Sequence, residues 1–256
     1  MSNKIQTAER VSQSDVSDNF VFQRSYLAYV EAAKLVSGKV LEIGTGSGYG
    51  IELLSNQADS FLTIDKFESQ VGAKAAKEIE NVEFRQMNVP PLTDLPDNHF
   101  DFVVSFQVIE HIQKDDVFVK EIHRVLKPGG KFIHTTPNKK MSLTRNPWHI
   151  REYTVSELND LLLVDFSSVQ KNGVFGNDIA MKYYAENKAS VRKIMRFDVL
   201  NLQYNLPRWM LQVPYDILNR RNRNKLSDSG AHIKLEDYFV AEANDECIDL
   251  FYIAEK

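Results

Sequence analysis

Short apolar runs and amphipathic segments alternate along the first 170 residues of the chain. Five runs rich in β-branched and aromatic residues lie at positions 40–43, 61–64, 82–84, 102–106 and 131–135. Segments with a helical spacing of apolar residues separate most of these runs. Strands that alternate with helices are typical of a parallel sheet with crossover helices, so the pattern predicts an α/β fold.

The polar positions mark where helices begin and end. Residues 22–36 have helical spacing and stop at a Ser-Gly pair, which predicts a first helix. Another helix is expected to begin at Asp115 and Asp116, because acidic residues suit the positive end of a helix dipole. Its inward face is expected to comprise Val117, Phe118, Ile122 and Val125.

The second half of the chain is less regular. Thr154 followed three residues later by Glu157 is the signature of a capping box, and therefore of a helix N-terminus. A strand is expected near 166–170, and the apolar run 248–254 predicts a closing strand that pairs with the sheet. Residues from about 176 to 240 hold helix-compatible stretches at 179–186 and 189–202, so we predict a mainly helical insertion there.

Composition narrows the class of protein. The 256 residues are 43% hydrophobic, enough for one substantial core, and carry a formal net charge of −4. That balance gives no general attraction to nucleic acid or to a membrane, so neither is expected as a partner. Residues 1–18 are polar and no apolar run reaches the roughly 18 to 20 residues that cross a bilayer, so we expect a soluble, cytoplasmic protein.

The most informative stretch follows the first strand, where glycines occupy positions 44, 46, 48 and 50 before a helical segment. Glycines tolerate positive φ and let a ligand lie against the backbone. Asp65 ends the second strand 21 residues after Gly44, the placement expected for a carboxylate that binds ribose hydroxyls. The stretch therefore predicts a nucleoside site. A dinucleotide fingerprint would need a glycine at position 49, where the chain has Tyr49.

The pattern Glu42-x-Gly44-x-Gly46-x-Gly48 resembles that of the class I S-adenosylmethionine-dependent methyltransferases. The segment 126–133, Leu-Lys-Pro-Gly-Gly-Lys-Phe-Ile, is similar to the link into the fifth strand of that family. The resemblance covers roughly residues 22–170 and the final strand. It implies a Rossmann-like, doubly wound, seven-stranded, mostly parallel sheet with an antiparallel last strand. We expect one domain over 1–256, with an N-terminal helical segment at 1–37.

The same resemblance assigns the cofactor site. It implies that Asp65 holds the ribose, that Asn88 and the backbone of Val89 lie beside the adenine, and that Gln107 lies at the methionine end. Two alternatives stay open, since Asn88 could initiate a turn before two prolines and Gln107 could cap the next helix. The full expected set for S-adenosylmethionine is Glu42, Gly44, Thr45, Gly46, Gly48, Asp65, Lys66, Asn88, Val89 and Gln107.

Two histidines are candidates for the catalytic base. Methyl transfer to a hydroxyl or protonated amine requires loss of a proton, and histidine suits that task near neutral pH. His111 follows the fourth strand, and His149 lies in the motif His-x-Arg-Glu-Tyr after a Thr-Pro-Asn segment. This combination is similar to small-molecule methyltransferases, including relatives of the ubiquinone-pathway O-methyltransferases. The alternative is that His149 and Glu152 only order their loop.

A metal is not predicted. Some methyltransferases bind a divalent cation through Glu-x-x-Glu-His after the fourth strand, but this chain has Gln107 in place of the first glutamate. An amide is a poorer ligand for a hard cation, and Glu110 and His111 remain a pair to test.

The insertion at about 176–240 is expected to form a cap on the substrate side. Its aromatic residues could line an acceptor pocket or pack against the sheet, and they are Tyr183, Tyr184, Phe197, Tyr204, Trp209 and Tyr215. The basic run at 220–225 is expected to be a solvated loop, with contact to RNA, phosphate or an acidic acceptor as the alternative.

These observations predict an enzyme that methylates an oxygen or nitrogen of a small-molecule acceptor. A nucleic-acid methyltransferase is an alternative, but the acidic balance argues against it. A cofactor-binding module without catalytic activity is a second alternative. The sequence leaves a homodimer open.

Overall fold

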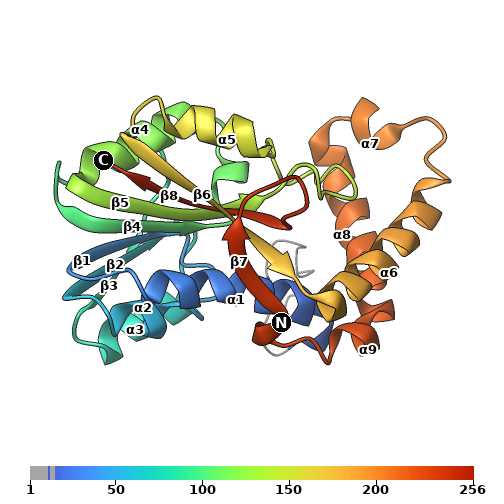
Figure 1. The fold of residues 1–256 in the computed structure, drawn as a ribbon, viewed down its shortest axis with the longest axis horizontal. Coiled ribbons are helices and arrows are strands. Elements are labelled where there is room, and N and C mark those ends of the chain that lie inside the picture. The colour runs from blue at the N-terminus through green and yellow to red at the C-terminus, as the bar shows by residue number, and fades with distance from the viewer. Residues whose placement is uncertain (1–10, 12–14) are drawn as a thin grey trace.

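The computed structural model describes residue 11 and residues 15–256, and these form an eight-stranded sheet (Figure 1). The strands are β1 (Lys39–Ile43), β2 (Ser60–Asp65), β3 (Val82–Gln86), β4 (Phe100–Phe106), β5 (Leu126–Pro137), β6 (Ser168–Gly176), β7 (Tyr238–Glu242) and β8 (Asp249–Glu255). Their order across the sheet is β3-β2-β1-β4-β5-β8-β6-β7.

The strand directions confirm the predicted fold class. Strands β1 to β5 pair in parallel, and β8 pairs antiparallel with both β5 and β6. The sheet differs from the expected seven strands by β7, which pairs antiparallel with β6 at the sheet edge. Strand β6 extends to residue 176, further than the expected 166–170, and its last residues provide the ladder on which β7 forms.

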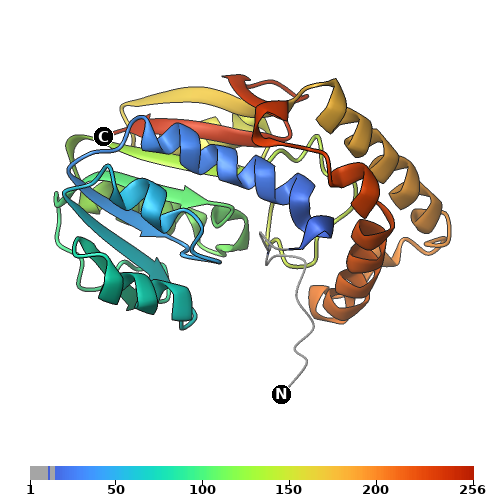
Figure 2. The same ribbon diagram turned by 90° about the horizontal axis from the view of Figure 1, so that it is seen from below.

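Helices cover both faces of the sheet (Figures 1 and 2). One face carries α1 (Asn19–Ala33), α2 (Ile51–Ser55) and α3 (Gln70–Glu78), and the other carries α4 (Asp115–Val125) and α5 (Val155–Leu162). The capping box at the start of α5 is present as predicted, with Thr154 accepting from the Glu157 amide. Residues 1–10 and 12–14 of the expected N-terminal segment lie outside the described part of the chain.

The side chains of β1 alternate between two hydrophobic cores. Leu41 and Ile43 pack into the core under α4 and α5, whereas Val40 packs into the core under α1 and α2. On α4, Phe118, Ile122 and Val125 are buried as expected. Val117 was assigned to the inward face wrongly: it is 36% exposed, and Val119 is buried in its place.

The helical insertion lies beside the sheet (Figure 1). It comprises α6 (Asp178–Met195), α7 (Leu202–Asn205), α8 (Arg208–Lys225) and α9 (Ser227–Gly230). Its two ends meet, because the Asn177 amide donates to the Asp237 carbonyl oxygen at 2.8 Å and the Asn177 side chain donates to the Asp237 carboxylate at 2.8 Å.

The basic run 220–225 is not the expected loop, since it forms the last turns of α8. Arg220 and Arg223 both donate to the carboxylate of Asp18, which is fully buried just before α1. These ion pairs attach α8 to the start of the first helix. Within the described residues, no helix is long and apolar enough to cross a membrane.

The strand order reverses direction between β1 and β4. From β1 the chain goes outward to β2 and β3, then returns to place β4 on the other side of β1. Their connections therefore diverge at the carboxyl ends and leave a crevice, the usual ligand position in open α/β sheets. The glycine loop follows β1 and Gln107 follows β4, so both lie at this crevice.

Candidate active site

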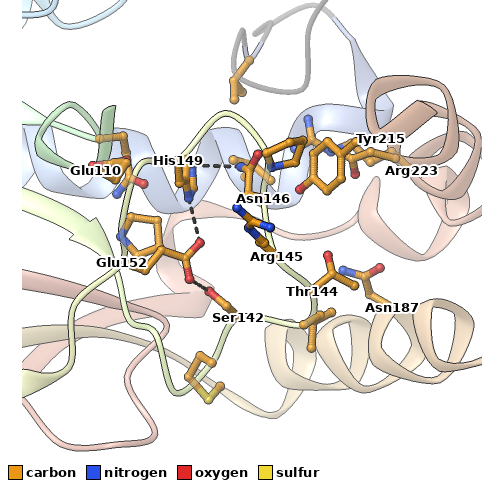
Figure 3. Close-up of a pocket in the computed structure, with 18 of the residues that line it drawn as sticks. Glu110, Ser142, Thr144, Arg145, Asn146, His149, Glu152, Asn187, Tyr215 and Arg223 are labelled. Carbon is orange, nitrogen blue, oxygen red and sulfur yellow. Dashed lines mark hydrogen bonds and ion pairs between the residues drawn. The ribbon is translucent and has the colours of Figure 1, made fainter. Parts of the chain in front are cut away.

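A cavity of about 890 Å³ occupies the crevice at the carboxyl ends of the strands. Its walls come from α1, from the loops after β1, β4 and β5, and from α6 and α8 of the insertion. Figure 3 shows polar side chains from these elements around the cavity. Among the expected cofactor residues, those that line it are Gly44, Thr45, Gly46, Asp65 and Gln107.

The glycine loop has the backbone that its sequence predicted. Gly44, Gly46 and Gly48 have φ values of +99°, +53° and +73°, which residues with side chains rarely adopt. A Cβ at Gly44 would lie 2.6 Å from the Val108 side chain. Asp65 accepts a hydrogen bond from the Gly46 amide at 3.0 Å and also lines the cavity. Its carboxylate thus orders the loop and faces the space beside it.

Glu42 lies behind the loop. Its buried carboxylate accepts hydrogen bonds from Tyr29 at 2.9 Å and from Thr63 at 2.5 Å, and it is absent from the cavity lining. Burial raises the pKa of Glu42 to about 7, against the opposing effect of the two hydroxyl donors. The hydroxyl oxygens of Thr63 and Thr45 lie 2.7 Å apart. A chain of hydrogen bonds therefore connects Glu42, through Thr63, to Thr45 in the cavity wall.

Four other expected residues lie outside the cavity lining. Gly48 contributes backbone conformation, since a Cβ there would lie 2.4 Å from Val71. The Lys66 ammonium lies 4.8 Å from the centroid of the Phe67 ring. Asn88 is exposed and Val89 is half-buried in the segment after β3.

Gln107 occupies the end of β4 with a left-handed backbone, φ +57°. Its amide nitrogen donates to the Thr135 hydroxyl at 3.2 Å, which holds the side chain against β5. The residue lines the cavity. It is therefore a wall residue fixed from the neighbouring strand.

His149 is held by neighbours in its own loop (Figure 3). Its Nδ1 lies 2.7 Å from the Glu152 carboxylate, and its Nε2 lies 2.9 Å from the Asn146 amide nitrogen. Ser142 donates a short hydrogen bond to the other oxygen of Glu152. His149 and Glu152 are mostly buried, with 10% and 14% of their side chains exposed, and both line the cavity. A histidine paired with a carboxylate in this way is oriented for proton transfer.

His111 and the buried Glu110 lie next to His149. The two imidazole centroids are 5.1 Å apart, and one ligand atom from each of Glu110, His111 and His149 lies within 4.8 Å of the others. Burial raises the pKa of Glu110, and the nearby histidines oppose that shift. His111 Nδ1 contacts the Trp148 carbonyl oxygen at 3.0 Å. The structure thus brings together the pair singled out in the sequence and adds His149, which could complete a cation site.

The structure adds Arg24 to the expected cavity residues and decides which aromatic residues of the insertion line the cavity. Arg24 on α1 lines the cavity, and its Nε lies 2.8 Å from the carboxylate of Asp249 on β8. The sequence does hint at this role, because Arg24 is a cation in a predicted helix whose positions 27, 28 and 29 are apolar or aromatic. Four of the insertion's six aromatic residues also line the cavity, namely Tyr183, Tyr184, Phe197 and Tyr215. Tyr204 and Trp209 are exposed instead.

Comparison with known proteins agrees with this geometry. Residues 41–134 match the family described as Methyltransferase domain. A probable S-adenosylmethionine-dependent methyltransferase of Mycolicibacterium smegmatis is 38% identical over 162 residues, which cover 61% of this chain and 62% of the relative. Over these residues the chain is therefore similar to S-adenosylmethionine-dependent methyltransferases. The matched residues include Gly44, Asp65 and Gln107, which line the cavity.

More distant relatives of the methyltransferase domain widen the comparison. A ubiquinone biosynthesis O-methyltransferase of Pseudomonas syringae is 29% identical over 112 residues, covering 43% of this chain and 48% of the relative. The solved structure of an S-adenosylmethionine-dependent methyltransferase of Thermotoga maritima, a possible histamine N-methyltransferase, superposes with a TM-score of 0.56 at 18% identity. It covers 93% of this chain and 92% of that structure, and at this identity it shows the fold alone. The chain spans less than two thirds of the length of the curated relatives it matches.

Proposed function

We propose that the protein transfers a methyl group from S-adenosylmethionine to an oxygen or nitrogen of a small-molecule acceptor. The observation that carries the proposal is that one cavity holds both the glycine loop with Asp65 and the His149–Glu152 pair. A candidate donor site and a candidate proton acceptor thus line the same cavity, as methyl transfer to a protonated acceptor requires.

The donor end of the cavity fits the cofactor. Gly44 and Gly46 present backbone without a Cβ, and Asp65 presents a carboxylate suited to two ribose hydroxyls. Gln107 offers an amide in the lining of the same cavity. When bound, S-adenosylmethionine supplies a methyl group activated by a sulfonium. The roles of Glu42, Gly48, Lys66, Asn88 and Val89 remain predictions, with Glu42 and Gly48 acting through the loop's conformation.

His149 is our candidate base. With the proton on Nδ1, this nitrogen donates to Glu152, and Nε2 accepts from the Asn146 amide. An acceptor hydroxyl or ammonium that replaces the Asn146 amide would donate its proton to Nε2. The Glu152 carboxylate would then stabilise the imidazolium, as a carboxylate does in a hydrolase triad. His111 is the second candidate because its ring is adjacent.

We also propose that 1–256 acts as one domain in which the insertion caps the acceptor side. This rests on cavity-lining residues from both α6 and α8, and on the ion pairs between α8 and Asp18.

The donor half is tested by calorimetric titration of S-adenosylmethionine and its demethylated product. Asp65→Asn should weaken binding about 10- to 100-fold, the effect of losing a charged hydrogen-bond partner. Asp97→Asn is the control, because that exposed carboxylate pairs with Arg124 and is absent from the cavity lining. Undetectable binding by the wild-type protein would overturn the proposal.

The acceptor half is tested by turnover against phenols, amines, sugars and RNA. His149→Ala should lower kcat about 100- to 10,000-fold and leave S-adenosylmethionine affinity unchanged. The same assay with a chelator and with added Mg²⁺ separates a proton acceptor from a cation ligand. Methylation of RNA alone would contradict a small-molecule acceptor, and binding of the cofactor without turnover across the panel would favour a non-catalytic module.

A further inference from the structure

The outer end of the insertion exposes an unusual set of large apolar side chains. We call this set the apolar tip, and it comprises Phe197, Val199, Leu200, Leu202, Tyr204, Trp209, Met210 and Val213. Phe197 is 88% exposed, Val199 85% and Trp209 72%. In Figure 1 this segment surrounds α7, at the end of the molecule farthest from β1–β3. Clustered exposed apolar residues mark an interaction surface in a folded protein.

Positive charge accompanies the apolar tip. Residues 178–230 contain ten Lys or Arg and five Asp or Glu. Arg220 and Arg223 pair with Asp15 and Asp18, and with these two carboxylates included the net charge is +3. Three of these cations, Arg192, Lys193 and Arg196, are exposed at the end of α6 immediately before the tip. The overall charge of −4 conceals this local excess. Apolar side chains flanked by cations are the combination that binds anionic bilayers.

The apolar tip is continuous with the cavity. Phe197 and Leu202 belong to both, and Ile194, Met195 and Leu211 line the cavity from the adjoining ends of α6 and α8. Apolar side chains therefore form part of the cavity wall where it approaches the tip, beside the polar Asp198 and Gln203.

The loop that carries His149 contacts the same region. Arg145 donates to the Gln203 carbonyl oxygen of α7 at 2.9 Å, and Arg208 of α8 donates to the Ile150 carbonyl oxygen. These hydrogen bonds thus join the loop of His149 to α7 and α8, which carry part of the apolar tip.

We propose that the apolar tip docks on an anionic lipid bilayer and that the acceptor is an amphiphile, with its apolar chain between α6 and α8 and its reactive group at His149. The acceptor part of this proposal rests on the proposed function. It departs from the expectation that no membrane is a partner, which was drawn from the charge of the whole chain. A second copy of the chain is a poorer occupant, because a two-fold contact would bring two positive surfaces together.

Docking is tested by co-sedimentation with vesicles of phosphatidylcholine, with and without phosphatidylglycerol. The wild-type protein should bind the anionic vesicles more tightly, and salt should weaken that binding. Val199→Ser with Leu200→Ser should reduce binding at least tenfold. The control is Val164→Ser, because Val164 is 78% exposed but follows α5, away from the insertion. Arg192→Glu should reduce the preference for anionic vesicles several-fold.

Absence of vesicle binding, or an equal loss in the Val164 variant, would overturn docking. Light scattering provides a further check: a wild-type dimer that the Val199/Leu200 double variant converts to a monomer would assign the tip to contacts between copies. Every variant is first titrated with S-adenosylmethionine, which verifies folding. Vesicle binding without cofactor binding would refute the proposed function and leave docking intact.

The acceptor class is tested by binding, so that the result does not depend on turnover. Calorimetry on protein saturated with the demethylated cofactor compares phenol with 4-octylphenol below its aggregation limit. We expect at least a tenfold gain in affinity from the octyl chain, and Leu211→Asn should reduce that gain. Equal affinity for the two phenols, or a gain that Leu211→Asn leaves unchanged, would overturn an amphiphilic acceptor.

Discussion

The buried carboxylate of Glu42 makes stability depend on pH in a way that one substitution can isolate. Only 1% of the residue is exposed, and two hydroxyl donors are its partners. Its pKa is raised from 4.5 to about 7, chiefly because burial disfavours the charged form. In Glu42→Gln the side chain keeps its shape but does not ionise.

The sign follows from comparing the folded and unfolded states. Because the folded pKa lies above the unfolded value, the favourable contribution of Glu42 is complete below pH 4.5 and is lost as the pH rises through about 7. A shift from 4.5 to about 7 corresponds to about 3 kcal/mol in full. The free energy of unfolding of the wild-type protein should therefore fall by about 2.5 kcal/mol between pH 5 and pH 8 through Glu42 alone.

Urea unfolding of both proteins at pH 5 and pH 8 measures this loss. The free energy of unfolding of Glu42→Gln minus that of the wild type should be about 2.5 kcal/mol more positive at pH 8 than at pH 5, because only the wild type loses stability over this range. Glu83→Gln on β3 is the control, because 57% of the Glu83 side chain is exposed. A difference that is the same at both pH values would refute the raised pKa. Glu42→Gln should also change S-adenosylmethionine affinity less than Asp65→Asn does, since Glu42 lies behind the cavity wall.

Three further substitutions test the packing around the site, each by urea unfolding. Thr154→Ala should cost about 1 kcal/mol by removing the cap of α5, whereas Ser156→Ala should cost less. Asp18→Asn should cost on the order of 3 kcal/mol, because it leaves two arginines of α8 without their buried anion, and protease sensitivity of α8 should rise with it. Gly50→Ala should cost about 1 to 3 kcal/mol, because the new Cβ would lie 1.9 Å from the Tyr29 ring, and an unchanged stability would contradict the close contact.

The features that the sequence predicted are those encoded locally. The strands of the parallel sheet, the positive φ angles of the glycine loop and the capping box each depend on residues close together in the chain. His149 and Glu152 are three residues apart, so their contact was also open to prediction.

The features that the sequence did not predict depend on distant partners. Strand β7 is a short exposed-edge segment whose pairing with β6 joins residues more than 60 positions apart. Arg24 is a cavity residue because Asp249, at the other end of the chain, holds it. The run 220–225, expected as a solvated loop, ends α8, and Arg220 and Arg223 pair with Asp15 and Asp18 some 200 positions away. Such contacts form only when the chain has folded, so the spacing of residues within one segment does not predict them.

The meeting of Asn177 with Asp237 has a consequence for how the protein can change. Both ends of the insertion are fixed to one point of the β6–β7 hairpin, so its length is not constrained by the sheet. The entropic cost of closing a loop rises only slowly with its length, so the segment between these two residues can be exchanged for one of another length. If the proposed function holds, grafting a different helical segment between residues 177 and 237 should give chimeras that keep the glycine loop and Asp65 and differ in the acceptor they bind.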